Sequence, residues 1–261
     1  MYKAFNLKIS MESFKVKFPE SINLEFMPSK IIQKTSLDKA VESLESLDAE
    51  EIHKTWFKDS QIDVFLSHSS KDEELAKILC AYLRAVFDLN VFIDSEAWHH
   101  MDIMLQKLDQ KYCVSEKNED GTVKTYLYAS RNVTTSHVHM ILSHVLPKMM
   151  DNAECFIYLN TPNSTSHQDD TSIGTLSPWL FHELAMVEII DEKKPFEPLL
   201  EGYACDSEDN RSYGPTINYS VNTKRLKSLS LDQVKLWQER FSRQSSSGRS
   251  SSLRLLYNIV D

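Results

Sequence analysis

Residues 62–94 decide the fold class, and they read IDVFLSHSSKDEELAKILCAYLRAVFDLNVFID. The stretch begins with a short apolar run, and Val91-Phe92-Ile93 form a second one near its end, as expected for strands that are buried on both faces. Between them, the apolar residues from Leu75 to Val86 recur at steps of three and four, which predicts an amphipathic helix. The order strand, helix, strand favours a parallel sheet.

Polar side chains follow both predicted strands. Ser67, His68 and Ser69 come directly after the first strand, and a predicted loop from Asp94 to Trp98 follows the second. Because parallel strands end at the same edge of a sheet, and ligands bind at that edge, we expect these side chains to line one pocket. Each also has a plainer explanation, since a histidine near a strand end is often solvated and an aromatic side chain can simply anchor a loop.

A second helix of interest begins at Ser177, because serine is a good N-cap and Pro178 suits the first helical position. It follows a third buried strand, at 155–159, and a predicted polar loop. Trp179 and Glu183 share one side of this helix with aliphatic residues. Burial raises the pKa of a carboxyl group, and perturbed acids gather at functional sites. The alternative is an ordinary structural glutamate, paired or solvated.

Other segments give the domain organisation. Residues 1–60 are predicted to form an N-terminal extension, with a hairpin over 14–26 and a helix over 36–56. Residues 61–241 form the main α/β domain, into which a hairpin around Gly121, within 112–128, is inserted. Residues 242–261 are predicted to be a serine-rich linker and a short apolar end.

Composition excludes several classes of function. The formal charge of −9 and pI near 5.5 argue against a nucleic-acid-binding surface. The chain has no apolar run of membrane-spanning length and no apolar signal sequence, so we expect a cytoplasmic protein without membrane contact. The four cysteines are scattered, which indicates reduced thiols, and no metal site is expected. The glycines form no phosphate-binding loop.

Three segments together resemble a TIR (Toll/interleukin-1 receptor) domain of the bacterial type over roughly residues 61–241. They are Asp63 to Ser69 with Asp72, Val91 to Asp94 with Trp98, and Ser177 to Trp179 with Glu183. In NAD-cleaving members of that family a tryptophan stands four residues before the catalytic glutamate, as Trp179 stands before Glu183. The segment SEAWHHMD at 95–102 departs from the family, which has a tight turn there. The resemblance implies a flavodoxin-like parallel sheet with helices on both faces.

The resemblance also implies a reaction, which is cleavage of the bond between nicotinamide and ribose in NAD, and a role in anti-phage defence. NAD would be the substrate and no cofactor would be needed. Glu183 is the expected catalytic residue, and the expected substrate-binding residues are Ser67, His68, Ser69, Asp94, Trp98 and Trp179. The product is ADP-ribose or a cyclic form of it. Expected partners are a second copy of the chain or a partner defence protein. Two alternatives stay open: a non-catalytic TIR adaptor that acts by TIR–TIR association, and a nucleoside deoxyribosyltransferase-like enzyme.

Overall fold

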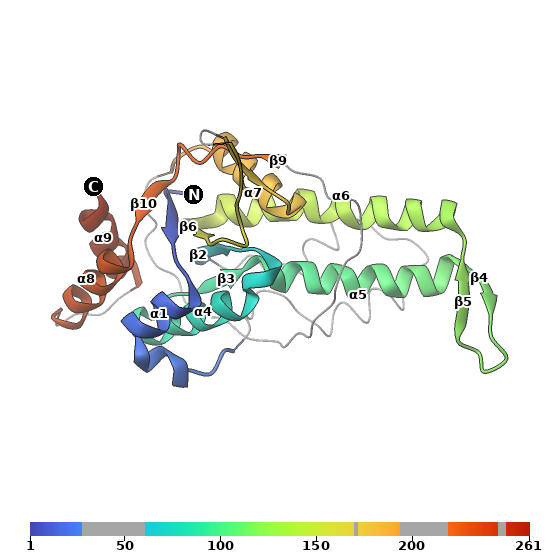
Figure 1. The fold of residues 1–261 in the computed structure, drawn as a ribbon, viewed down its shortest axis with the longest axis horizontal. Helices are drawn as coiled ribbons and strands as arrows, with labels where there is room; N and C mark the ends of the chain where they lie inside the picture. Colours follow the sequence, from blue (N-terminus) through green and yellow to red (C-terminus); the bar gives the residue numbers. More distant parts are fainter. Residues whose placement is uncertain (28–60, 170–171, 194–218, 245–248) are drawn as a thin grey trace.

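A parallel sheet of five strands forms the centre of the protein in the computed structural model, which describes residues 1–27, 61–169, 172–193, 219–244 and 249–261 (Figure 1). The strand order is β10-β1-β6-β2-β3, and each neighbouring pair is parallel. The strands are β1 (Lys3–Lys8), β2 (Ile62–Ser67), β3 (Val91–Ile93), β6 (Ala153–Asn160) and β10 (Lys227–Leu229). The predicted α/β class with a parallel sheet is confirmed.

Helices cover both faces of the sheet, and each face has its own hydrophobic core. On one face lie α1 (Met11–Lys17), α4 (Glu73–Phe87), α8 (Leu231–Ser242) and α9 (Arg249–Val260). On the other lie α5 (Asp94–Tyr112), α6 (Tyr128–Asn152) and α7 (Pro178–Ile189). Two short 3-10 helices are also present: η1 (Pro19–Asn23) follows α1 along the chain, and η2 (Ser70–Asp72) follows β2.

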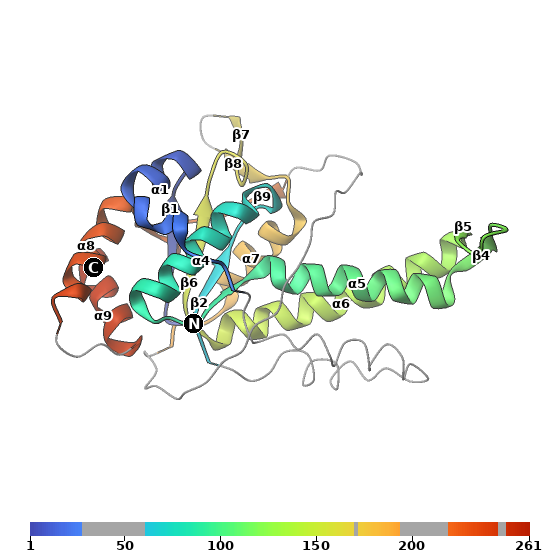
Figure 2. The same cartoon turned by 90° about the horizontal axis from the view of Figure 1, so that it is seen from below.

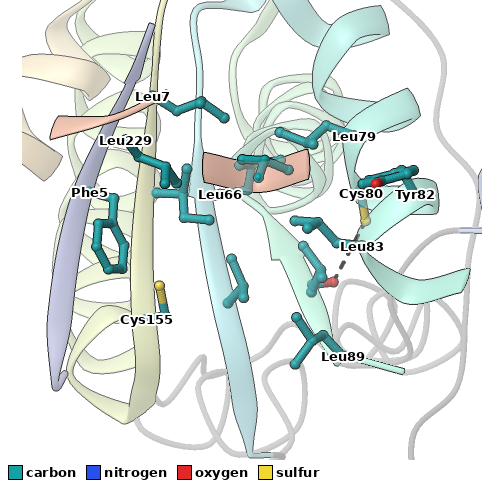
Figure 3. Close-up of a cluster of buried hydrophobic side chains, with 14 of the residues drawn as sticks. Phe5, Leu7, Leu66, Leu79, Cys80, Tyr82, Leu83, Leu89, Cys155 and Leu229 are labelled. Atoms are coloured by element: carbon teal, nitrogen blue, oxygen red, sulfur yellow. Dashed lines mark hydrogen bonds between the residues drawn. The ribbon is translucent and has the colours of Figure 1, made fainter. Parts of the chain in front are cut away.

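The alternation of side chains along the strands supplies both cores. In β2, Leu66 joins the core beneath α4, whereas Phe65 joins the core beneath α5 and α6. Figure 3 shows the first of these cores, in which Leu79 and Leu83 of α4 face the sheet. Strands β2, β3 and β6 are buried on both faces, which explains why these three have largely apolar sequences. The thiols of Cys80, Cys113 and Cys155 are free and buried, and Cys205 lies outside the described residues.

The predicted N-terminal hairpin is wrong, because its first half is helix α1. Phe14 and Phe18 are four residues apart and both are buried, whereas Val16 between them is 83 % exposed. A spacing of four fits one face of a helix, so the apparent alternation was misleading. Ser10 caps α1 through a capping box with Ser13. The predicted helix over 36–56 lies outside the described residues.

Strand β1 also comes from the segment that was predicted to be an extension. It pairs with β6 on one side and with β10 on the other, so it is an inner strand of the main sheet. Counted from β2, the order is that of a flavodoxin-like sheet, 2-1-3-4-5, with β1 in the fourth position. The N-terminal segment is therefore integral to the fold.

Helices α5 and α6 form an arm that extends past the edge of the sheet (Figures 1 and 2). With 19 and 25 residues, they are about 28 and 37 Å long at 1.5 Å per residue. The predicted inserted hairpin is confirmed at the end of this arm, where β4 (Val114–Lys117) pairs antiparallel with β5 (Val123–Tyr126). Gly121 in its turn has a φ of 83°, a conformation that favours glycine.

Two further segments differ from the prediction. The expected polar loop at 160–175 contains β7 (Ser166–Asp169) and β8 (Ser172–Thr175), which form a small antiparallel sheet with β9 (Tyr219–Ser220). Part of the expected C-terminal linker is helix α9, which packs on α8, and the indole N–H of Trp237 donates to the Ser252 carbonyl at 2.8 Å.

Candidate active site

The predicted site residues lie where β2 and β3 end, on the edge of the sheet at which parallel α/β folds bind ligands. Ser67 is the last residue of β2, and His68 follows it. Asp94 directly follows β3 and is the first residue of α5. The strand order reverses between β2 and its neighbour β6, and ligands of such folds bind at the point of reversal, next to the residues at the end of β2.

Glu183 reaches this edge from α7. The Ser177 hydroxyl caps the helix as predicted, accepting the N–H of Leu180 at 3.3 Å. The hydroxyl of Ser67 donates to Oε2 of Glu183 at 2.6 Å, across 116 residues of sequence. Both side chains are completely buried. The expected convergence of the α7 glutamate with the end of β2 is therefore present.

Asp94 holds His68 in place. Its Oδ2 accepts the backbone N–H of His68 at 3.1 Å, and its Oδ1 accepts the backbone N–H of Ser95 at 2.8 Å. The Nδ1 atom of His68 also contacts Oδ1 of Asp94, although its orientation does not meet the geometry of a hydrogen bond. Asp94 thus links the first turn of α5 to the segment that follows β2.

Asp94 and Glu183 form a buried carboxyl pair, in which each group acts on the pKa of the other. Burial raises the pKa of both groups, and the nearby charge of Asp94 raises that of Glu183 further. Two adjoining carboxyl groups in a buried site cannot both be charged without a large cost, so the pair retains a proton. Burial lowers the pKa of His68 to about 4, which leaves its imidazole neutral at neutral pH.

Trp98 lies one turn along α5 from Asp94. Its ring stacks on that of His68, with centroids 5.7 Å apart and an interplanar angle of 20°. The segment from Asp94 to Trp98 was predicted to be a loop, which is wrong, because α5 begins at Asp94. The helix fixes the position of Trp98 relative to Asp94 more tightly than a loop would.

Ser69 and Trp179 have other contacts. The Ser69 hydroxyl accepts the N–H of Lys71 at 3.4 Å and so caps η2. Trp179 packs edge-on against His139 of α6, with ring centroids 5.6 Å apart. The structure therefore brings Ser67, His68, Asp94, Trp98 and Glu183 together, while the contacts of Ser69 and Trp179 are those of a cap and of a core side chain.

One network at the same edge was not predicted. Asp72 accepts hydrogen bonds from the Thr161 hydroxyl at 2.5 Å and from the Asn163 amide at 2.8 Å. These bonds tie the segment after β2 to the segment after β6. Asp72 was noted in the sequence as part of a motif, but its partners come from a polar stretch in which no spacing distinguishes them.

Unpartnered polar atoms concentrate in this group of residues. In the part of the chain that the structure describes, ten buried side-chain nitrogen or oxygen atoms have no hydrogen-bond partner, and five of them belong to His68, Ser95, Trp98 and Glu183. They include Nε2 of His68 and Oε1 of Glu183. Buried polar groups are nearly always paired in proteins, so such a concentration marks a place where a ligand or water completes the bonding.

The arm contains a separate hollow of about 670 Å³ between α5 and α6. It is lined mainly by apolar side chains, among them Met104, Leu108, Tyr112 and Met140. None of the predicted site residues lines it. Across the described residues, no group of three or more His, Cys, Asp or Glu side chains is arranged to hold a metal ion.

Comparison with known proteins gave no match to a protein-family model, to a curated protein or to a solved structure. Within the described ranges, no helix has the length and apolar character needed to cross a membrane.

Proposed function

We propose that this protein is a TIR-type NAD glycohydrolase, in which Glu183 is the catalytic residue. The observation that carries the proposal is the position of Glu183. It is completely buried at the carboxyl edge of a parallel sheet, is held by Ser67 through one oxygen, and has an Oε1 atom without a hydrogen-bond donor among the described residues. A glutamate that only stabilised the fold would be expected to have donors for both oxygens, whereas the other neighbour of Glu183 is a second acid, Asp94.

The chemistry requires one carboxylate. When the bond between nicotinamide and C1′ of the ribose breaks, its electron pair leaves with nicotinamide, which departs neutral because its ring was cationic. Positive charge develops on the ribose, and a carboxylate beside it lowers the barrier. Water then adds to C1′ and loses a proton, giving ADP-ribose. Attack by an adenine nitrogen or a ribose hydroxyl instead would give a cyclic product.

The other residues of the group have supporting roles. Ser67 fixes the orientation of the Glu183 carboxyl group, and Trp98 offers an aromatic face to a base or to nicotinamide. Because Glu183 is completely buried, substrate entry requires side chains around it to move. An enclosed site strengthens electrostatic interactions and limits the access of water. Cytoplasmic location, self-association and a role in anti-phage defence, which the resemblance implies, belong to the same proposal.

The test is to incubate the purified protein with NAD and measure nicotinamide release by chromatography. We expect Glu183→Gln to lower turnover on the order of a hundredfold or more, because Gln cannot carry the negative charge. Glu192→Gln, at an exposed position shortly after α7, is the matched control and should keep full turnover. The assay is repeated at high protein concentration, since assembly promotes activity in TIR enzymes. Equal turnover in Glu183→Gln and wild type would refute the assignment.

The carboxyl pair favours a second candidate, a nucleoside deoxyribosyltransferase-like enzyme. A neutral base leaves a sugar readily only if it receives a proton, and the proton held by Asp94 and Glu183 could serve this purpose. Incubation with a deoxynucleoside and a second free base tests this candidate, because exchange of the bases gives a new nucleoside. If the wild type acts on neither substrate at high concentration, the non-catalytic adaptor becomes the preferred function.

A further inference from the structure

We infer that, in the resting protein, Asp94 carries the negative charge of the buried pair and Glu183 carries the proton, so that Asp94 is a positioning residue that sets the state of the catalytic group. The catalytic meaning of this inference rests on the proposed function. The distribution of charge and proton does not, because it follows from the contacts of the two carboxyl groups.

The first argument is the number of donors on each side. Asp94 accepts two backbone N–H bonds, from His68 and Ser95, and its carboxyl group also contacts the imidazole of His68. Glu183 accepts one bond, from the Ser67 hydroxyl. Hydrogen bonds that end on a carboxylate stabilise its charged form, so the negative charge is more stable on Asp94.

The second argument is the position of each group in its helix. Asp94 is the first residue of α5, a helix of 19 residues, and the N-terminal end of a helix stabilises negative charge. Glu183 is the sixth residue of α7, where the backbone N–H groups are already bonded within the helix. Its buried neighbours on α7 are the apolar residues Leu180, Leu184 and Val187. Such surroundings favour the neutral form of an acid.

The remaining titratable groups do not reverse this preference. His68, after β2, is the ionisable group that faces both carboxyl groups, and burial keeps it neutral at neutral pH. Asp72, Glu73 and Lys77 act on His68 in turn, with charges of both signs. Oε1 of Glu183, which no donor reaches among the described residues, is the atom suited to carry the proton and donate it to Asp94.

This arrangement explains how Glu183 can become negatively charged when a cationic substrate binds. The positive ring of an N-ribosyl pyridinium stabilises a negative charge near it. When such a substrate binds at Glu183, the proton passes to Asp94, the pair keeps one proton and one negative charge, and Glu183 becomes the carboxylate. A neutral N-glycoside provides no such stabilisation and would leave the proton on Glu183.

The experiment is a carboxyl-carbon NMR titration of the full chain labelled with ¹³C-glutamate, in which Glu183→Gln identifies the Glu183 signal. In the wild type we expect this signal at the position of a protonated carboxyl group at neutral pH. Asp94→Asn removes the adjacent negative charge, so the titration midpoint of Glu183 should move to lower pH. Ser67→Ala removes the hydroxyl that stabilises the charged form, so the midpoint should move to higher pH. Asp102→Asn, at an exposed acid further along α5, should leave it in place.

An ionised Glu183 at neutral pH in the wild type, or an unchanged midpoint in a folded Asp94→Asn variant, would overturn the inference. If Asp94→Asn does not fold, ¹³C-aspartate labelling of the wild type decides instead, because the inference requires an ionised Asp94 at neutral pH. No turnover is needed for these measurements. A protein that titrates as expected but does not cleave NAD would refute the proposed function and leave the charge distribution standing.

Discussion

His68 illustrates how strongly the site depends on burial. Carboxylates near it, among them those of Glu73 and Asp72, would raise the pKa of an exposed histidine. Burial has the larger effect and lowers the pKa to about 4. The imidazole is therefore a neutral group with a free Nε2, suited to exchange hydrogen bonds with a ligand and unsuited to act as a permanent cation.

This neutrality gives a pH dependence of stability. A folded-state pKa near 4, against 6.5 for the unfolded chain, means that the folded state resists protonation. The stability that neutral His68 contributes is present above 6.5 and is lost as pH falls through 4. We expect about 3 kcal/mol of unfolding free energy to be lost over this window relative to His68→Gln, measured by urea unfolding. In His137→Gln, a variant of an exposed histidine, the loss seen in wild type should persist.

The sequence was sufficient to predict that Ser67, Asp94 and Glu183 lie at one edge of the sheet. It was not sufficient to predict which of their side chains contact one another. Apolar runs gave the ends of β2 and β3, and the cap at Ser177 gave the start of α7, so Ser67 and Glu183 were expected to be neighbours. Whether Asp94 would contact substrate or Glu183 depends on the direction of its side chain. That direction follows from the start of α5 at Asp94, where a loop had been predicted. The start of α5 depends on how the whole helix packs.

At the scale of elements, the arm is the feature that needs its own stabilisation. Its outer end lies away from the sheet, and a buried polar cluster holds α5 to α6 there. Asp109 accepts bonds from the Arg131 guanidinium at 2.7 Å and from the Thr134 hydroxyl at 2.6 Å. Asp109 and Thr134 are buried, so the cluster replaces contacts that a larger core would give.

We expect Asp109→Ala to loosen the outer arm without unfolding the sheet. The Arg131 guanidinium would lose its acceptor, and the buried Thr134 hydroxyl would keep only the Arg131 carbonyl at 3.0 Å, which together costs about 1–3 kcal/mol. Hydrogen exchange of backbone amides should become faster at the end of α5 and the start of α6, and should stay unchanged in β2 and β6. Asp102→Ala removes an exposed acid from the same helix and should alter neither region. Uniformly faster exchange would show that the arm and sheet open together.

Helix α1 shows why some elements were predicted incorrectly. Residues at positions 14, 16 and 18 are apolar, a pattern that fits a strand of period two and equally the i, i+4 face of a helix with one exposed valine. The exposure of Val16 distinguishes the two, and exposure depends on what α1 packs against. Phe14 and Phe18 both pack on Tyr82 of α4, a partner that local sequence cannot reveal.

For the whole molecule, the position of β1 changes how the chain is divided. The strand comes first in the sequence but lies between β6 and β10, so the sheet is complete only when the N-terminal segment is in place. β1 is as long as β2 but contains Lys3, Asn6 and Lys8, and its sequence therefore lacks the continuous apolar character that identified β2 and β6. Long-range pairing of this kind cannot be deduced from local patterns.

The C-terminal helices are joined to this sheet through Trp237. Its ring stacks on Phe87 of α4 with centroids 3.7 Å apart, and its N–H bonds the Ser252 carbonyl in α9. We expect Trp237→Ala to lower the unfolding free energy by about 3–5 kcal/mol, through loss of buried area and of this bond. Trp237→Phe keeps an aromatic ring and removes the donor to the Ser252 carbonyl, so its cost should be smaller, about 0.5–1.5 kcal/mol. Leu236→Ala, at an exposed neighbour, is the control for urea unfolding. If Trp237→Ala costs no more than this control, α8 and α9 are not part of the same cooperative unit as the sheet.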